Sequence, residues 1–395
     1  MSAASPEISW RTGNARWLRL ALRQLRLRLY RHAIATSPSG ERPIAWLVAA
    51  DDVELTRATP AELDREITGL DLELAGAALV PPPALVSLGE LAGLSDLERN
   101  LLLLATAPAF DSAFAQVYAE LAGDARRVFA TPQLALSMLV PDADQRLVAG
   151  DCLMVTRPLR RLRLIGLDDD DRQPPLLRAL TVDERIVDYL RGANHVEARL
   201  SELPGPVVER LPSAAAERAG CEAAAIIARD PAHWTTVNLV GSASHGALDA
   251  ATHACELLGL TPRSLDLERF IAHPYAERTE LTALIGREAL LAGLAVIVDA
   301  DDLCNAIDGS RSAEAERAVN ALIGSLDATL FVVSGDRWPG DSDVATVRVS
   351  RLSRVEQAAL WRSALSPCAN SVNGEVDAIV QQFDLGPGAI AAVVR

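Results

Sequence analysis

The chain has 395 residues and a formal net charge of −15, and hydrophobic residues make up 49% of it. This length allows two or three domains with sizeable cores. The negative charge argues against nucleic-acid binding by the surface as a whole, although it is compatible with one local basic patch. All 38 basic residues are arginines, so no side chain can supply a lysine to a phosphate-binding loop.

The cysteines are few and widely spaced: Cys152, Cys221, Cys255, Cys304 and Cys368. An odd number without a C-x-x-C pair predicts free, buried thiols in a reducing compartment, and argues against a zinc site. The N-terminus lacks the apolar core of a signal peptide, and no run of 18 apolar residues occurs. We therefore expect a cytoplasmic protein with no membrane partner.

Residues 1–58 are predicted to contain a basic helix and a short strand. The helix, over residues 10–32, places leucines on one face and arginines largely on the other, among them Arg16, Arg19, Arg23 and Arg26. Such arginines either remain solvated or dock on an acidic partner or a nucleic-acid backbone, and the first interpretation is favoured. The strand is expected at residues 44–50.

Residues 59–180 are predicted to form a helix-rich domain of winged-helix type. Ser95 and Glu98 have the spacing of a capping box, and Thr131 followed by proline starts a further helix. The alternating residues 159–165 predict a strand, which an acidic turn at 168–171 follows. Winged-helix domains bind DNA or proteins, and the acidic setting favours protein. We interpret the aspartates as a solvated hairpin tip rather than a metal site.

A helical connector is expected over residues 181–212, followed by an α/β core over residues 213–350. Strands are predicted at residues 236–240, 263–267, 294–298, 329–333 and 344–349, with helices at 214–229, 247–258, 275–292 and 312–325. This alternation predicts a doubly wound parallel sheet, as in a P-loop NTPase core. Helices at 354–365 and 375–394 complete a small α-helical lid within residues 351–395.

The loop after the first of these strands has the glycine spacing of a phosphate cradle, G-x-x-x-x-G-K-[ST]. Ala247 stands where the phosphate-binding lysine belongs, and Leu248 where the magnesium-binding hydroxyl belongs. Backbone amides at a helix N-terminus could still attract a phosphate weakly. The candidate residues of this degenerate nucleotide-binding loop are Gly241, Ser244, His245, Gly246, Ala247 and Leu248.

Two further strands end in residues of the kind that a nucleotide-hydrolysing sheet carries. Asp299 matches the first position of a Walker B motif, but Ala300 replaces the glutamate that activates water. Asp301 and Asp302 are displaced by one and two residues, which matters because side chains alternate along a strand. Ser334 ends the next strand, at the position of a phosphate sensor. These residues are Walker B-like and sensor-like candidates, and we predict no catalytic residue.

Two other polar groupings near the loop are not expected to function. Adjacent residues such as Ser244 and His245 rarely face one another, and no third orienting group is identifiable for them. His245 and His253 with Asp299 resemble a metal site in composition, but we interpret them as a polar cluster at the strand edge.

Residues 94–104, LSDLERNLLLL, are similar to the LSxFER-x-LLLL segment of a bacterial family, and residues 158–165 and 180–190 also resemble it. That family joins a variant winged-helix domain to two tandem AAA+ ATPase modules, and its members are encoded with extracellular contractile injection systems. The resemblance covers approximately residues 10–395. The order of strands, loop and closing helices likewise resembles one AAA+ module with its lid.

In that family the first module is typically degenerate, and the second carries the working lysine and acidic pair. Nothing resembling a second module is present here. The resemblance therefore implies the N-terminal part of a longer ATPase, or a chain that has lost its motor. We expect no cofactor, with ATP and magnesium bound at most weakly. Expected partners are other copies in a ring or injection-system components, and nucleic acid is less favoured.

The favoured function is that of a non-hydrolysing AAA+-like module that acts in scaffolding, partner engagement or ring assembly for an ATPase. One alternative is an active ATP-binding ATPase with divergent motifs. A second is a DNA-binding regulator that uses the winged helix and the arginine-rich helix over residues 11–31.

Overall fold

The computed structural model describes residues 6–36, 57–169, 172–201, 203, 213–230, 234–241, 246–301, 309–339, 344–365, 375–383 and 385–394. The chain divides into two compact units, Met1–His195 and Val196–Arg395, and each is described by itself.

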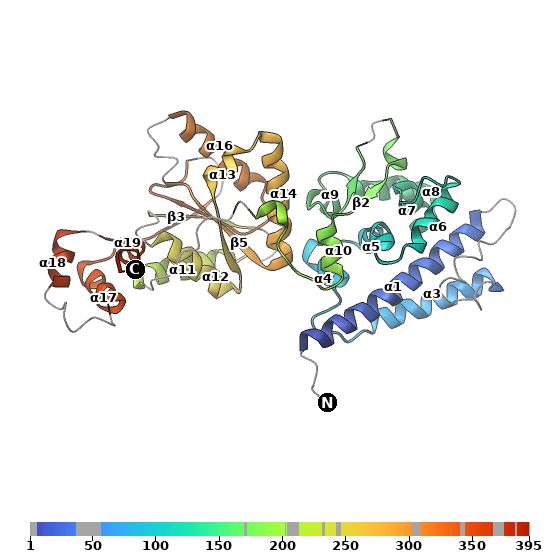
Figure 1. The fold of residues 1–395 in the computed structure, drawn as a ribbon, viewed down its shortest axis with the longest axis horizontal. Helices are drawn as coiled ribbons and strands as arrows, with labels where there is room; N and C mark the ends of the chain where they lie inside the picture. The colour runs from blue at the N-terminus through green and yellow to red at the C-terminus, as the bar shows by residue number, and fades with distance from the viewer. Residues whose placement is uncertain are drawn as a thin grey trace. The chain divides into compact units, whose positions relative to one another are not determined.

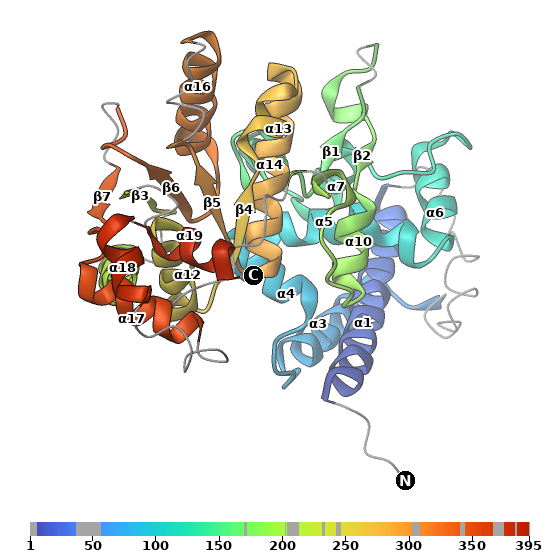
Figure 2. The same ribbon diagram turned by 60° about the vertical axis from the view of Figure 1, so that its left-hand side comes forward.

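The first unit is organised on a long helix, α1 (Pro6–Thr36), which packs against α3 (Pro60–Ala75), as Figures 1 and 2 show. Several of its arginines pair with carboxylates of the same unit, in the pairs Arg23–Glu66, Arg26–Asp111, Arg28–Asp71 and Arg31–Asp64. Arg16 and Arg19 are exposed. Much of the predicted basic face is therefore used inside the unit.

Short helices and one small hairpin complete the first unit. The predicted capping box is confirmed, because the Ser95 hydroxyl accepts from the Glu98 backbone NH while the Glu98 carboxylate accepts from the Ser95 NH at 2.9 Å. The antiparallel strands are β1 (Gly166–Leu167) and β2 (Leu180–Thr181). The helices are α4 (Ala84–Ala92), α5 (Asp96–Phe110), α6 (Ala113–Ala122), α7 (Pro132–Leu139), α8 (Ala143–Ala149), α9 (Pro158–Arg161) and α10 (Glu184–Leu190), with 3-10 helices at Gly150–Leu153 and Pro175–Leu177.

The strand predicted at residues 159–165 is wrong. Helix α9 occupies the start of this segment, and Arg163 adopts a positive φ of 53° just after it. Leu159 and Leu162 are both buried because they lie three residues apart on one helical turn. The alternation of leucine and arginine therefore came from a turn of helix, and the hairpin begins only at Gly166.

In the described part of the chain, no single helix is long and apolar enough to cross a membrane. Helices α5 and α6 meet the criteria of length and composition only as a pair, which is bent by 119°.

The second unit is a five-stranded parallel sheet in the order β4-β5-β6-β3-β7, and Figure 2 shows the strands in this order from β7 on the left to β4. The strands are β3 (Thr236–Val240), β4 (Thr261–Leu265), β5 (Leu294–Asp299), β6 (Leu330–Ser334) and β7 (Ala345–Arg348). Helices cover both faces, so the predicted α/β fold with a doubly wound parallel sheet is confirmed (Figure 1).

One face of the sheet packs against α13 (Leu267–Ala272), α14 (Tyr275–Ala292) and α16 (Gly309–Ser325). The other face packs against α11 (Ala214–Ile227) and α12 (Ala247–Leu258), and this core is rich in alanine. The buried alanines of the two helices are Ala216, Ala219, Ala223, Ala224, Ala247, Ala250, Ala251 and Ala254.

The C-terminal lid consists of α17 (Arg354–Ala364), α18 (Glu375–Gln382) and α19 (Pro387–Val394). Its buried residues pack together with Ala215 of α11. The prediction of one helix over residues 375–394 is wrong, because α18 ends at Gln382 and α19 begins at Pro387. Proline lacks the backbone NH needed inside a helix but is tolerated in its first turn, so the chain starts a new helix there.

Candidate nucleotide-binding site

The predicted site residues lie at the carboxyl ends of three neighbouring strands. β6 lies between β3 and β5, and the register pairs Val240 with Ser334 and Val333 with Asp299. The loop that begins at Gly241, the Ser334 hydroxyl and the Asp299 carboxylate are therefore carried by one edge of the sheet. Of the predicted site residues, three lie outside the described residues: Ser244, His245 and Asp302.

Both glycines of the loop are in conformations that favour glycine. Gly241 has a φ of 153°, and a Cβ built on it would lie 3.1 Å from Val349 Cβ. Its backbone NH donates to the carbonyl of Ser334 at 2.9 Å, which holds the start of the loop against β6. Gly246 has a φ of 101° and is the N-cap residue of α12. The glycine spacing read from the sequence thus corresponds to two real backbone requirements.

The first turn of α12 carries a buried carboxylate and lacks the two polar groups of a phosphate cradle. Ala247 is fully buried, and the partly buried Leu248 packs against the same apolar core. Asp249 is only 3% exposed, and its Oδ2 lies 3.8 Å from the Cβ position of Gly246. Pro387 Cγ of the lid lies 3.4 Å from that position. The N-terminus of α12 is therefore lined by an acid and approached by the lid.

The acidic residues after β5 bond to the backbone. The Asp301 NH donates to Asp299 Oδ1 at 3.2 Å, and the Gly335 NH donates to Asp301 Oδ1 at 3.0 Å. A Cβ on Gly335 would lie 2.8 Å from that oxygen, so the close approach requires glycine. These carboxylates join the ends of β5 and β6. Within the described ranges, no group of three or more His, Cys, Asp or Glu residues could hold a metal ion.

Ser334 accepts a hydrogen bond within the sheet from Asn238, which was not among the predicted site residues. Asn238 is fully buried in β3, and its Nδ2 donates to Ser334 Oγ at 2.7 Å and to the Val332 carbonyl at 3.0 Å. Its Oδ1 accepts from the Trp338 NH at 2.9 Å. The Ser334 hydroxyl donates to the carbonyl of Asp336 at 2.7 Å. The sequence contained one signal for this residue, because Asn238 is an amide side chain within a mostly apolar strand.

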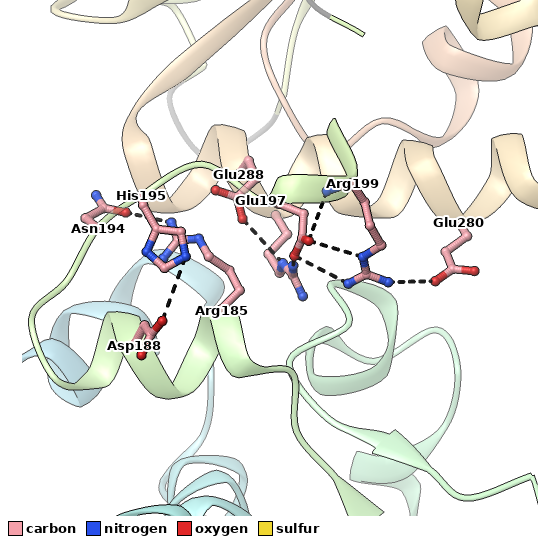
Figure 3. A network of polar contacts seen from close by, with 9 residues as sticks. Arg185, Asp188, Asn194, His195, Glu197, Arg199, Glu280 and Glu288 are labelled. Carbon is pink, nitrogen blue, oxygen red and sulfur yellow. Dashed lines mark hydrogen bonds and ion pairs between the residues drawn. The ribbon is translucent and has the colours of Figure 1, made fainter. Parts of the chain in front are cut away.

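A buried ion-pair network connects α14 to the start of the second unit (Figure 3). Arg287 Nη2 donates to Glu197 Oε2 at 2.6 Å, and Arg287 Nε lies 3.6 Å from Glu288 Oε1. Arg199 adds hydrogen bonds to Glu197 and reaches the exposed Glu280 at 3.2 Å. Burial alone would raise the pKa of Glu197, but the hydrogen bonds and charge of Arg199, with the charge of Arg287, lower it overall. The network anchors the 3-10 helix Ala198–Leu200 to α14.

Figure 3 also includes polar contacts that belong to the first unit. Arg185, which is 3% exposed, donates to Asn194 Oδ1 at 2.6 Å and lies over the Tyr189 ring. His195 Nε2 lies 3.8 Å from Asp188 Oδ2. These contacts hold the end of α10 to the residues that follow it.

Two known families match parts of the chain. The family described as "Winged helix domain, variant" matches residues 15–203, and the family described as "Contractile injection system ATPase helical domain" matches residues 353–395. The first match includes nearly all the described residues of the first unit, and the second includes α17, α18 and α19. Both ends of the predicted arrangement, a variant winged helix and an ATPase lid, are therefore confirmed.

A comparison with solved structures gives a partial likeness to the replication initiator DnaA bound to AMPPCP and single-stranded DNA. The two chains are 14% identical, with a TM-score of 0.31. The alignment covers 45% of this chain and 60% of that chain, so it spans less than two thirds of the DnaA chain. No curated protein matches the sequence significantly.

Proposed function

We propose that the AAA+-like sheet, which lies between the winged-helix match and the ATPase helical-domain match, does not hydrolyse ATP. In this proposal the module engages protein partners and supports ring assembly. ATP hydrolysis then belongs to a second module or to another subunit.

The observation that carries the proposal is the position of Asp249. In a phosphate-binding loop, the N-terminus of the following helix meets the phosphate with its free NH groups and its positive dipole end. Here a carboxylate that is 3% exposed occupies that first turn, close to Gly246. A triphosphate would bring a second set of negative charges to a poorly solvated place, where like charges repel strongly.

The other positions of the site support the same proposal. The side chain at Ala247 cannot supply the positive charge that stabilises the transferring phosphoryl group. Asp301 is bonded to the Gly335 NH, and the Ser334 hydroxyl donates to a backbone carbonyl. Both side chains are therefore engaged in hydrogen bonds at the carboxyl ends of β5 and β6. Productive hydrolysis would require these bonds to be rearranged.

Titration calorimetry with ATP and magnesium tests the proposal directly. The expected result is no heat of binding at ligand concentrations up to about 1 mM, which corresponds to less than about 4 kcal/mol of binding free energy. A submicromolar Kd would overturn it. Circular dichroism melting of the same sample shows that the protein is folded.

A matched pair of variants tests whether the Asp249 carboxylate is what prevents nucleotide binding. Asp249→Asn keeps the shape and removes the charge, so we expect measurable, weak binding of ATP or inorganic phosphate in this variant. Glu222→Gln removes an exposed carboxylate from α11 and should bind no better than the parent chain. If both variants behave like the parent, Asp249 is not the barrier.

Sedimentation velocity tests the assembly role. The distribution of oligomers over a range of protein concentrations should show self-association that is unchanged by ATP and magnesium. Assembly that appears only with ATP would contradict a module that does not bind nucleotide, and a monomer at every concentration would exclude self-assembly of this chain.

A further inference from the structure

Helices α11 and α12 carry a polar cluster that the proposed function does not use. Cys221 Sγ lies 3.8 Å from His253 Nε2, and Nδ1 of the same ring lies 3.3 Å from Glu256 Oε2. Cys221 is exposed, while Cys152 and Cys255 are buried. The prediction that the thiols are buried is therefore wrong for Cys221. Two further cysteines lie outside the described residues: Cys304 and Cys368.

A close approach of the two helices brings these side chains together. A Cβ on Gly220 would lie 2.8 Å from the Ala250 carbonyl oxygen and 2.9 Å from His253 Cβ. The two helices can approach this closely only because residue 220 is a glycine. Cys221 follows Gly220 directly. Glu256 lies three residues after His253, on the same face of α12. The cluster is therefore set by helix packing and by helical spacing.

The arrangement suits proton transfer better than metal binding. The thiol and the carboxylate contact opposite nitrogens of one imidazole, so their donor atoms do not converge on a common point. With Nδ1 donating to Glu256, Nε2 keeps a lone pair directed at the Cys221 sulfur. A base that contacts a nucleophile and is itself oriented by a third group is the general arrangement of an activated nucleophile.

The charged groups near this cluster come from α11 and α12. On α12 they are Asp249, which is buried one turn before His253, and Glu256 itself. On α11 the exposed neighbours of Cys221 are Glu217, Arg218 and Glu222. Charges of both signs therefore lie on the two helices that carry the cluster.

We propose that Cys221 is a reactive thiol that exchanges with low-molecular-weight disulfides, with His253 as the proton acceptor and Glu256 as a positioning residue. The exposed position gives small disulfides access to the sulfur. The product is a mixed disulfide on the outer face of α11.

The exchange balances without any further reactant. As the Cys221 thiol gives its proton to His253 Nε2, its sulfur attacks one sulfur of RS–SR and forms the new S–S bond. The other sulfur leaves with the electron pair of the broken bond and takes the proton from the imidazolium. Cys221 is oxidised to the mixed disulfide, and one molecule of RSH is produced.

The experiment uses glutathione disulfide with the folded chain, and mass spectrometry of proteolytic peptides assigns each adduct to its cysteine. At about pH 6.5 an ordinary thiol is almost fully protonated, so we expect Cys221 to react roughly tenfold faster than the same cysteine in the urea-unfolded chain. His253→Gln should remove that advantage at this pH. At about pH 9.5 the rates of the parent and the variant should converge, because an ordinary thiol ionises there unaided.

Four further variants separate this role from a structural one. Glu256→Gln should slow the exchange near neutral pH, and Glu256→Asp should restore part of it. Glu222→Gln, which changes an exposed carboxylate on α11, should stay within about twofold of the parent rate. Cys221→Ser should abolish the adduct on its own peptide while leaving the others. Equal rates for the folded and unfolded chains, or a His253→Gln variant that keeps the parent's pH profile, would overturn the proposal.

Discussion

Arg287 Nη2 donates a 2.6 Å hydrogen bond to Glu197 Oε2, and the Arg287 side chain is completely buried. The two residues are 90 positions apart, and their contact ties the start of the second unit to the middle of α14. A buried charge is tolerated only with its partner, so each residue makes the other necessary.

Arg287→Ala should therefore lower the free energy of unfolding by about 3–5 kcal/mol, because it leaves the carboxylates of Glu197 and Glu288 buried without this cation. Urea denaturation measures the change. Arg311→Ala is the matched control, since Arg311 pairs with Glu268 at 3.1 Å on the surface, and its cost should stay below about 1 kcal/mol. Similar losses in the two variants would contradict a stabilising role for the buried pair.

Glu197 should also contribute to the pH dependence of stability. Its pKa is lower in the folded protein than normal, so the unfolded chain binds more protons in acid. The contribution is complete above the ordinary glutamate pKa of about 4.3 and is lost as the pH falls through the lower folded value. Between about pH 5 and pH 3, unfolding free energies should therefore fall more steeply for the parent than for Glu197→Gln. Parallel curves would show that Glu197 does not titrate differently on folding.

Asn238→Ala should destabilise the sheet by about 2–4 kcal/mol, because it removes hydrogen bonds at a fully buried position and leaves the Trp338 NH without its acceptor. Ser334→Ala should cost about 1–2 kcal/mol by the same reasoning. Chemical denaturation measures both changes. A Ser334→Ala variant of unchanged stability but altered ATP binding would assign Ser334 to phosphate sensing instead.

Ser95→Ala should destabilise the first unit by about 1 kcal/mol, because the Ser95 hydroxyl caps the free Glu98 NH at the start of α5. Ser112 provides the comparison, since it is the N-cap residue of α6 but makes no side-chain capping bond. Ser112→Ala should change the unfolding free energy by less than about 0.5 kcal/mol. Thermal unfolding of the two variants side by side gives the result.

Most elements of the sheet unit were predictable because their signals are local. Helix α13 was not predicted, and β4 begins two residues before the strand predicted at 263–267. The predicted bounds of β3, α12 and α14 agree with the structure, and Gly259 and Gly293 end the two helices in the left-handed conformation. Apolar periodicity and a terminal glycine act within a few residues, so a single sequence contains them. The same holds for the glycines at each end of the loop after β3.

The contacts that decide the chemistry were not predictable, because they join residues far apart in the chain. Asn238 and Ser334 are 96 positions apart, and Cys221 and His253 are 32 apart. Sequence spacing placed Ser334 at a strand end, but its hydroxyl donates to the backbone carbonyl of Asp336, which lies outside any strand. Such pairings depend on strand order and helix packing, which a periodic pattern leaves open.

The alanine-rich packing of α11 and α12 has a consequence for how this half of the protein becomes ordered. Alanine has no side-chain rotamers to restrict, so the two helices can associate with little loss of conformational entropy beyond that of the backbone. Each alanine also buries little apolar area, so attraction must come from dispersion at short range. The interface therefore forms with a small loss of side-chain entropy, but its stability depends on the two helices remaining in close contact. A single added methylene at this contact would hold the helices apart, and it would weaken the packing of the other alanines between them.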